Sequence, residues 1–171
     1  MPKKESAAAL LLKTVKILVV FFTLSAIGWF VERLPFAQSL PFLSFKLPIG
    51  VFLGSVISLL MLIALVRFGS ETAPAVDSLL EFIPKAGKLF GNLVNIGACL
   101  FAYYSFQPAV LPFIAEYEWA YQEVFLGLVL FFLARVGLLM YAASEDISRF
   151  LLGFLEPYRQ EKDVKEVQPP N

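Results

Sequence analysis

The chain has 171 residues, of which 58% are hydrophobic and only 16% are charged, and its formal net charge is zero. A soluble domain usually carries about 25% charged and about 45–50% apolar residues. The composition therefore argues against a water-soluble fold and predicts a protein whose solvent is lipid. The zero net charge gives no reason to expect a nucleic-acid partner.

Residues that usually carry chemistry are scarce. The sequence has no histidine, which removes the commonest metal ligand and the commonest acid–base group. Its one cysteine, Cys99, lies in an apolar stretch and is interpreted as a packing residue. We find no Gly-rich phosphate loop, metal-ligand cluster or nucleophile–base pair. We therefore expect no catalytic, cofactor or metal site, and a protein that is not an enzyme.

Four apolar stretches are long enough to cross a bilayer as helices, which takes about 20 residues each. They cover residues 11–31, 49–66, 89–106 and 124–143. Lys3 and Lys4 before the first stretch resemble the charged start of a signal peptide. The apolar run is long and no A-x-A cleavage site follows it, so we expect this segment to be retained as a span.

The distribution of Lys and Arg predicts how the spans are oriented. Eleven of the 14 Lys and Arg residues fall in the N-terminal segment, the connection between the second and third spans, and the C-terminal tail. These three segments share one side of a four-span chain. Because Lys and Arg accumulate in cytoplasmic segments, both termini are expected to face the cytoplasm, in a plasma or inner membrane.

Short motifs recur in the same order in both halves of the chain, about 70 residues apart. Val51–Gly54 matches Val124–Gly127, Leu40–Phe42 matches Leu111–Phe113, Ile27-Gly28 matches Ile96-Gly97, and Leu79–Phe82 partly matches Leu151–Phe154. The pattern predicts two tandem, parallel helical-hairpin repeats, each made of two spans and an amphipathic helix. The repeats would cover residues 1–88 and 89–156.

Each amphipathic segment carries an apolar stripe at helical spacing. The first stripe is Val76, Leu79, Leu80 and Ile83, and the second is Ile147, Phe150, Leu151, Phe154 and Leu155. Such helices either lie in the headgroup plane, which we favour, or cover the end of the bundle. Pro84 and Pro157 are expected to end or kink them, and residues 157–171 are expected to form a disordered cytoplasmic tail.

Two connections on the outer side are unusual. Residues 34–48 are apolar and rich in proline, and are interpreted as an interfacial cap or, alternatively, a re-entrant element. The other connection carries Glu116, Glu118 and Glu123 among aromatic residues, without Lys or Arg. It fits an aromatic belt with solvated acids, and its alternative is a pore mouth that concentrates cations.

Arg135 is the most informative single residue, because it is a charge inside the fourth span. Such charges usually face the bundle or water, and no acidic residue lies inside any span. Asn92 and Asn95 of the third span are the nearest expected partners by depth. Arg135 is either a structural arginine that snorkels or bonds a neighbouring helix, or part of an anion, headgroup or pore site.

Gly50, Gly54 and Ser58 form a small-xxx-small series, which predicts a close helix-packing face on the second span.

The sequence as a whole favours a non-enzymatic accessory or scaffold subunit of a membrane assembly, as a homo-oligomer or with other membrane subunits. The alternative is a small oligomeric channel or transporter with Arg135 lining the path.

Overall fold

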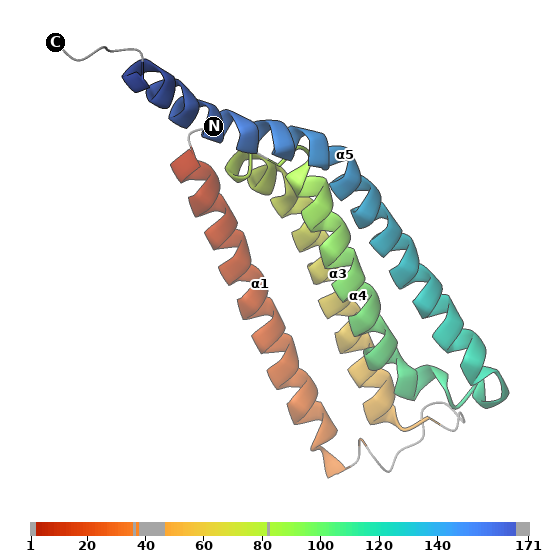
Figure 1. Cartoon of the computed structure of the whole chain (residues 1–171). Helices are drawn as coiled ribbons and strands as arrows, with labels where there is room; N and C mark the ends of the chain where they lie inside the picture. The colour runs from red at the N-terminus through yellow and green to blue at the C-terminus, as the bar shows by residue number, and fades with distance from the viewer. Residues whose placement is uncertain (1–2, 36, 38–46, 82, 167–171) are drawn as a thin grey trace.

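The computed structural model describes residues 3–35, 37, 47–81 and 83–166. Its helices are α1 (Lys3–Glu32), α3 (Ile49–Leu79), α4 (Ala86–Val110), the short 3₁₀ helix η1 (Ala115–Tyr117) and α5 (Glu118–Glu166). The long helices run alternately up and down, so that α1 and α4 begin at the end of the molecule where α3 stops (Figure 1). The protein is therefore all-helical, as the sequence predicts.

The long helices form an open row in chain order. α1 packs on α3, α3 packs on α4, and α4 packs on α5. In the described part of the chain, no Cα atom of α1 comes within 8 Å of one in α5. The Phe21 ring of α1 nevertheless reaches Phe101 of α4, with ring centroids 6.1 Å apart. The central pair α3–α4 thus supports both outer helices.

Four helices are long and apolar enough to cross a membrane: Lys4–Glu32, Ile49–Leu79, Ala86–Val110 and Ala115–Ser144. Their large apolar side chains point outward, as Phe22 (79% exposed) and Leu138 (70%) do. The buried residues are mostly small, and Thr72 is completely buried. This reverses the usual arrangement of a soluble protein and fits a multi-pass membrane protein.

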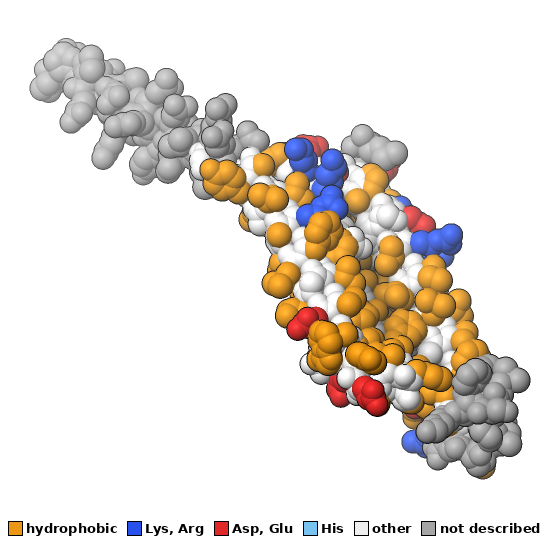
Figure 2. Space-filling model, turned by 90° about the vertical axis from the view of Figure 1, so that its right-hand side faces the viewer, with side chains coloured by type: hydrophobic (Ala, Val, Ile, Leu, Met, Phe, Trp, Pro, Cys, Tyr) orange, Lys and Arg blue, Asp and Glu red, His pale blue; other side chains and the backbone are white. Residues whose placement is uncertain are grey.

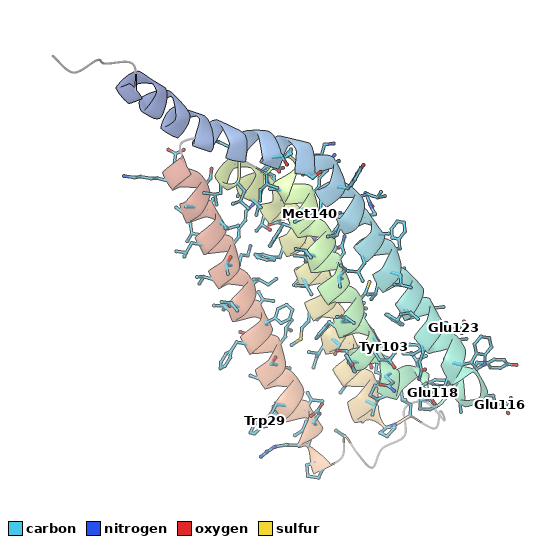
Figure 3. All side chains as sticks on the ribbon, in the orientation of Figure 1. Trp29, Tyr103, Glu116, Glu118, Glu123 and Met140 are labelled. Atoms are coloured by element: carbon cyan, nitrogen blue, oxygen red, sulfur yellow. The ribbon has the colours of Figure 1, made fainter. Side chains whose placement is uncertain are left out.

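The charged residues are concentrated at the two ends of the row. Hydrophobic side chains cover the middle of the face in Figure 2, Lys and Arg side chains gather toward the upper end, and a group of acidic side chains lies near the lower end. In Figure 3, Glu116, Glu118 and Glu123 lie at the end where α1 finishes, as Trp29 does, and Met140 lies toward the opposite end. We call these the acidic end and the basic end.

The helices are longer than the predicted spans. α3 continues through Pro74 to Leu79, so Val76 and Leu79 of the first amphipathic stripe belong to the span helix and not to a separate helix. Within α3, Val76 of this stripe is buried, whereas its polar neighbour Asp77 is exposed. A proline inside a helix removes one backbone hydrogen bond, yet α3 is helical on both sides of Pro74.

α5 also runs on without interruption. Its backbone is helical to Glu166, beyond residue 157, where the sequence predicts an unstructured tail to begin. The last part of α5 bends away and crosses the basic end of the row (Figure 1). Of the predicted outer connection at 34–48, residues 36 and 38–46 lie outside the described residues.

An aromatic cluster joins α4 to α5 toward the acidic end. The Tyr121 hydroxyl donates a 2.7 Å hydrogen bond to the Tyr103 carbonyl oxygen. The Tyr103 and Tyr121 rings stack with centroids 5.4 Å apart, and Phe125 lies 4.9 Å from the Tyr121 ring. Aromatic contacts and a hydrogen bond to the backbone therefore fix the hairpin.

Replacing Tyr121 by Phe tests this cluster, because Tyr121→Phe keeps the ring and removes the hydrogen bond. We expect a loss of about 1 kcal/mol in stability, the usual net value of one hydrogen bond, measured by thermal unfolding in detergent. The control is Tyr117→Phe, since Tyr117 is 59% exposed and its hydroxyl has no hydrogen bond to another described residue. Equal effects of both substitutions would contradict the assignment.

Candidate functional site

A cavity of about 620 Å³ opens between α3, α4 and α5 toward the basic end. α3 contributes four of its lining residues, α4 with its preceding residue contributes six, and α5 contributes three. They are Val66, Gly69, Ser70 and Ala73; Lys85, Gly87, Lys88, Gly91, Asn92 and Asn95; and Arg135, Leu138 and Leu139. The residues Arg135, Asn92 and Asn95, singled out by depth in the sequence, thus line the same cavity.

Small residues bring α3 and α4 together at this cavity. A Cβ atom at Gly69 would lie 2.9 Å from Val94 Cγ1, and one at Gly87 would overlap the Ala73 carbonyl oxygen. The Gly87 N–H donates a 2.6 Å hydrogen bond to Asp77 Oδ1. The carboxylate at the end of α3 therefore satisfies one of the free N–H groups at the start of α4 and suits its positive dipole end.

The α4 side of the cavity is a polar face at helical spacing. Lys88, Gly91, Asn92 and Asn95 follow the i, i+3, i+4, i+7 pattern, which places them on one side of a helix. Asn92 is only 6% exposed, and its amide has no hydrogen bond to another described residue. Lys85 precedes α4 with φ of 62°, a left-handed conformation uncommon for a lysine.

Arg135 faces this polar surface from α5. Its guanidinium carbon lies 5.8 Å from the ring centroid of Phe131, one turn away on the same helix. This distance is within the range of a cation–π contact. Among the residues whose side chains the structure describes, no carboxylate forms an ion pair with Arg135. The charge is therefore left available to a ligand or partner.

Gly50, Gly54 and Ser58 line a second cavity, of about 550 Å³, toward the acidic end of α3 and α4. A Cβ atom at Gly50 would lie 2.9 Å from the Ala37 carbonyl oxygen, whereas one at Gly54 would meet nothing within 4 Å. Gly50 is therefore in close contact with another part of the chain, whereas Gly54 is not. Gly54 and Ser58 instead border open space beside Ser55, Tyr104 and Ser105.

The cavity between α3, α4 and α5, called the basic cavity below, is also lined by Lys85 and Lys88, which the sequence identifies only as residues that orient the spans. The seven-residue spacing from Lys88 to Asn95 could have indicated that these residues share a face. The contribution of α3 could not be read from the sequence, because it depends on how closely Gly69 and Gly87 let the two helices approach. Among the described residues, no group of three His, Cys, Asp or Glu is arranged to hold a metal ion.

Comparisons with known protein families, with curated proteins and with solved structures find no match for this chain.

Gly87→Ala tests the close approach that forms one wall of the cavity. The added methyl group would overlap the Ala73 carbonyl oxygen, so we expect a loss of about 1–3 kcal/mol, typical of overpacking. The matched control is Gly91→Ala four residues later, where a Cβ meets nothing within 4 Å. There, alanine should be neutral or stabilise the helix by up to about 1 kcal/mol. Thermal unfolding in detergent measures both, and an equally stable Gly87→Ala protein would contradict the packing.

Proposed function

We propose that this protein is a non-enzymatic, multi-pass subunit of a membrane assembly and works through contacts between its helices and those of neighbouring chains. The open row of helices is the observation that carries the proposal. A row in which α1 and α5 do not meet leaves both faces of the central α3–α4 pair accessible. In lipid, helices associate through close packing and hydrogen bonds and not through hydrophobic burial, and this row offers both.

The cavity at Gly54 and Ser58 supports a specific association surface. Small residues and hydroxyl groups are enriched where membrane helices meet, because they allow backbones to approach and can bond across the interface. Ser55 donates its hydroxyl hydrogen to the Val51 carbonyl oxygen, at 2.9 Å, whereas Gly54 and Ser58 line the cavity and are the residues we propose to contact a neighbouring helix. The proposed occupant is a helix of a second copy or of another membrane subunit.

The two-repeat interpretation belongs to the same proposal. In it, α1 and α3 form one antiparallel hairpin and α4 and α5 form the other, and α3 packs on α4 where the two halves meet. The small-residue cavity distinguishes the halves, because Gly54 lines it, whereas its counterpart Gly127 is exposed on α5. We therefore propose that the chain associates with its partner through the first half, which contains Gly54.

Native mass spectrometry of the purified chain in mild detergent tests association. Gly54→Leu adds a side chain where the chain itself has open space, so we expect a folded protein with fewer copies per complex or fewer crosslinked partner chains. Gly127→Leu, also in open space, is the control and should behave like the wild type. Unchanged copy number and crosslinking in Gly54→Leu would refute this surface. A ring of several copies that conducts ions in liposomes would favour the channel alternative instead.

We also propose that the basic end faces the cytoplasm, because Lys4, Lys13, Arg67 and Lys88 lie there and positive residues accumulate on that side. The test is cysteine labelling of intact cells in a Cys99→Ala background with a membrane-impermeant reagent. Glu116→Cys, exposed at the acidic end, should react without permeabilisation. Lys4→Cys, exposed near the start of α1, should react only after it. The reverse pattern would invert the topology.

A further inference from the structure

The basic cavity is unusual in the charge of its lining. Lys85, Lys88 and Arg135 line it, and no carboxylate does so among the described residues. Asp77, the nearby acid, is bonded to the Gly87 N–H and is not part of the lining. Three cations on one cavity repel each other, so an anion bound between them lowers the electrostatic energy.

The side-chain amides of Asn92 and Asn95 supply hydrogen-bond donors to the same cavity. Asn92 is more than nine-tenths buried, lines the cavity, and has no hydrogen bond to another described residue. Asn95 lines the same wall two turns of α4 beyond Lys88. Both amides border the cavity, and each carries two N–H donors, so a ligand with several acceptor oxygens would accept hydrogen bonds from them.

The cations lie at two depths. Lys85 and Lys88 lie at the start of α4, at the level where the candidate span begins. Arg135 is nine residues before Ser144, the end of the fourth candidate span, which is about 13 Å of helix. A ligand in the cavity is thus held from the headgroup level by lysines and from within the span by an arginine, whose planar fork suits phosphate oxygens.

The surroundings favour a ligand that arrives from the bilayer. Leu138 and Leu139 form part of the wall, and Leu138 is 70% exposed. Phe131, one turn deeper than Arg135 on α5, is 55% exposed. A molecule with an anionic head and an apolar chain matches a polar cavity bordered by apolar surface. A free anion has no apolar chain to contact this apolar border.

From this arrangement we infer that the cavity between α3, α4 and α5 binds the phosphate of an anionic lipid headgroup in the leaflet at the basic end. Arg135 and Lys88 pair with the phosphate, Asn92 and Asn95 donate to its oxygens, and the acyl chains lie along α5 beside Phe131. Glycines make room for the headgroup, since a Cβ at Gly91 meets nothing within 4 Å. The site is at the opposite end of α3 from Gly54, so lipid binding and subunit association can be lost separately.

The test is native mass spectrometry of the full chain in mild detergent, titrated with phosphatidylglycerol or with phosphatidylcholine. Both lipids carry a phosphodiester, and only phosphatidylglycerol has a net negative charge. We expect the wild type to retain phosphatidylglycerol at least about tenfold better. Arg135→Gln should reduce that retention about tenfold or more, as the loss of a charge-assisted hydrogen bond predicts.

Two matched pairs of variants separate this site from general effects of charge and folding. Arg67→Gln also removes one positive charge, from α3 toward the basic end. Arg67 does not line the basic cavity, so this variant should keep the lipid. Gly91→Leu fills the cavity without changing charge and should lose the lipid. Gly97→Leu, on the same helix and also in open space, should keep it. The Gly91 pair tests the site even if Arg135→Gln fails to fold.

Three results would overturn the inference. One is equal retention of both lipids, and another is full retention of phosphatidylglycerol by Gly91→Leu. The third is that millimolar inorganic phosphate displaces the bound lipid and also occupies the cavity equally well when no lipid is present. That result would make the cavity a site for a soluble anion. Inorganic phosphate that neither binds nor competes would support the lipid as the ligand.

Discussion

The close approach of α3 and α4 is the contact on which the rest of the structure depends. At Gly69 the backbone of α3 meets Val94, and at Gly87 the backbone of α4 meets the Ala73 carbonyl. Asp77 completes the contact by accepting the Gly87 N–H, so the start of α4 is held by the end of α3. α1 then packs on α3 and α5 packs on α4. Without this central pair, neither outer helix would have a surface to occupy, and no cavity would form between α3, α4 and α5.

The same contact explains why polar groups can lie inside an otherwise apolar row. Helices that touch through glycine and alanine leave space beside the contact, and Asn92, Asn95 and Arg135 border that space. A charged side chain within a span is costly unless it meets protein, water or a headgroup. The described part of the chain supplies Arg135 with an aromatic ring and no carboxylate. An anion from outside the chain is the interaction that this site lacks, and the three cations favour it over a neutral partner.

The sequence predicts the spans well because their signal is local. Twenty apolar residues cross a bilayer whatever lies beside them, and each predicted stretch falls within a helix of the structure. Depth in the bilayer groups Asn92, Asn95 and Arg135 in the sequence, and the three residues line the same cavity. Lys85 and the α3 wall could not be predicted, because they depend on the turn after α3 and on the contacts of Gly69 with Val94 and of Gly87 with Ala73. The sequence also predicts separate amphipathic helices, whereas α3 passes through Pro74 and continues to Leu79, although the proline removes one backbone hydrogen bond.

The two cavities indicate a division between the ends of the row. At the acidic end, small residues and hydroxyl groups border a space without a cation in its lining, which suits another helix. At the basic end, the cations and amides border a space with room for a headgroup, which suits a lipid. Both spaces lie beside the α3–α4 pair, and α3 contributes to both. The two spaces have separate linings at opposite ends of α3, so the proposed lipid site and the proposed association surface can be altered independently.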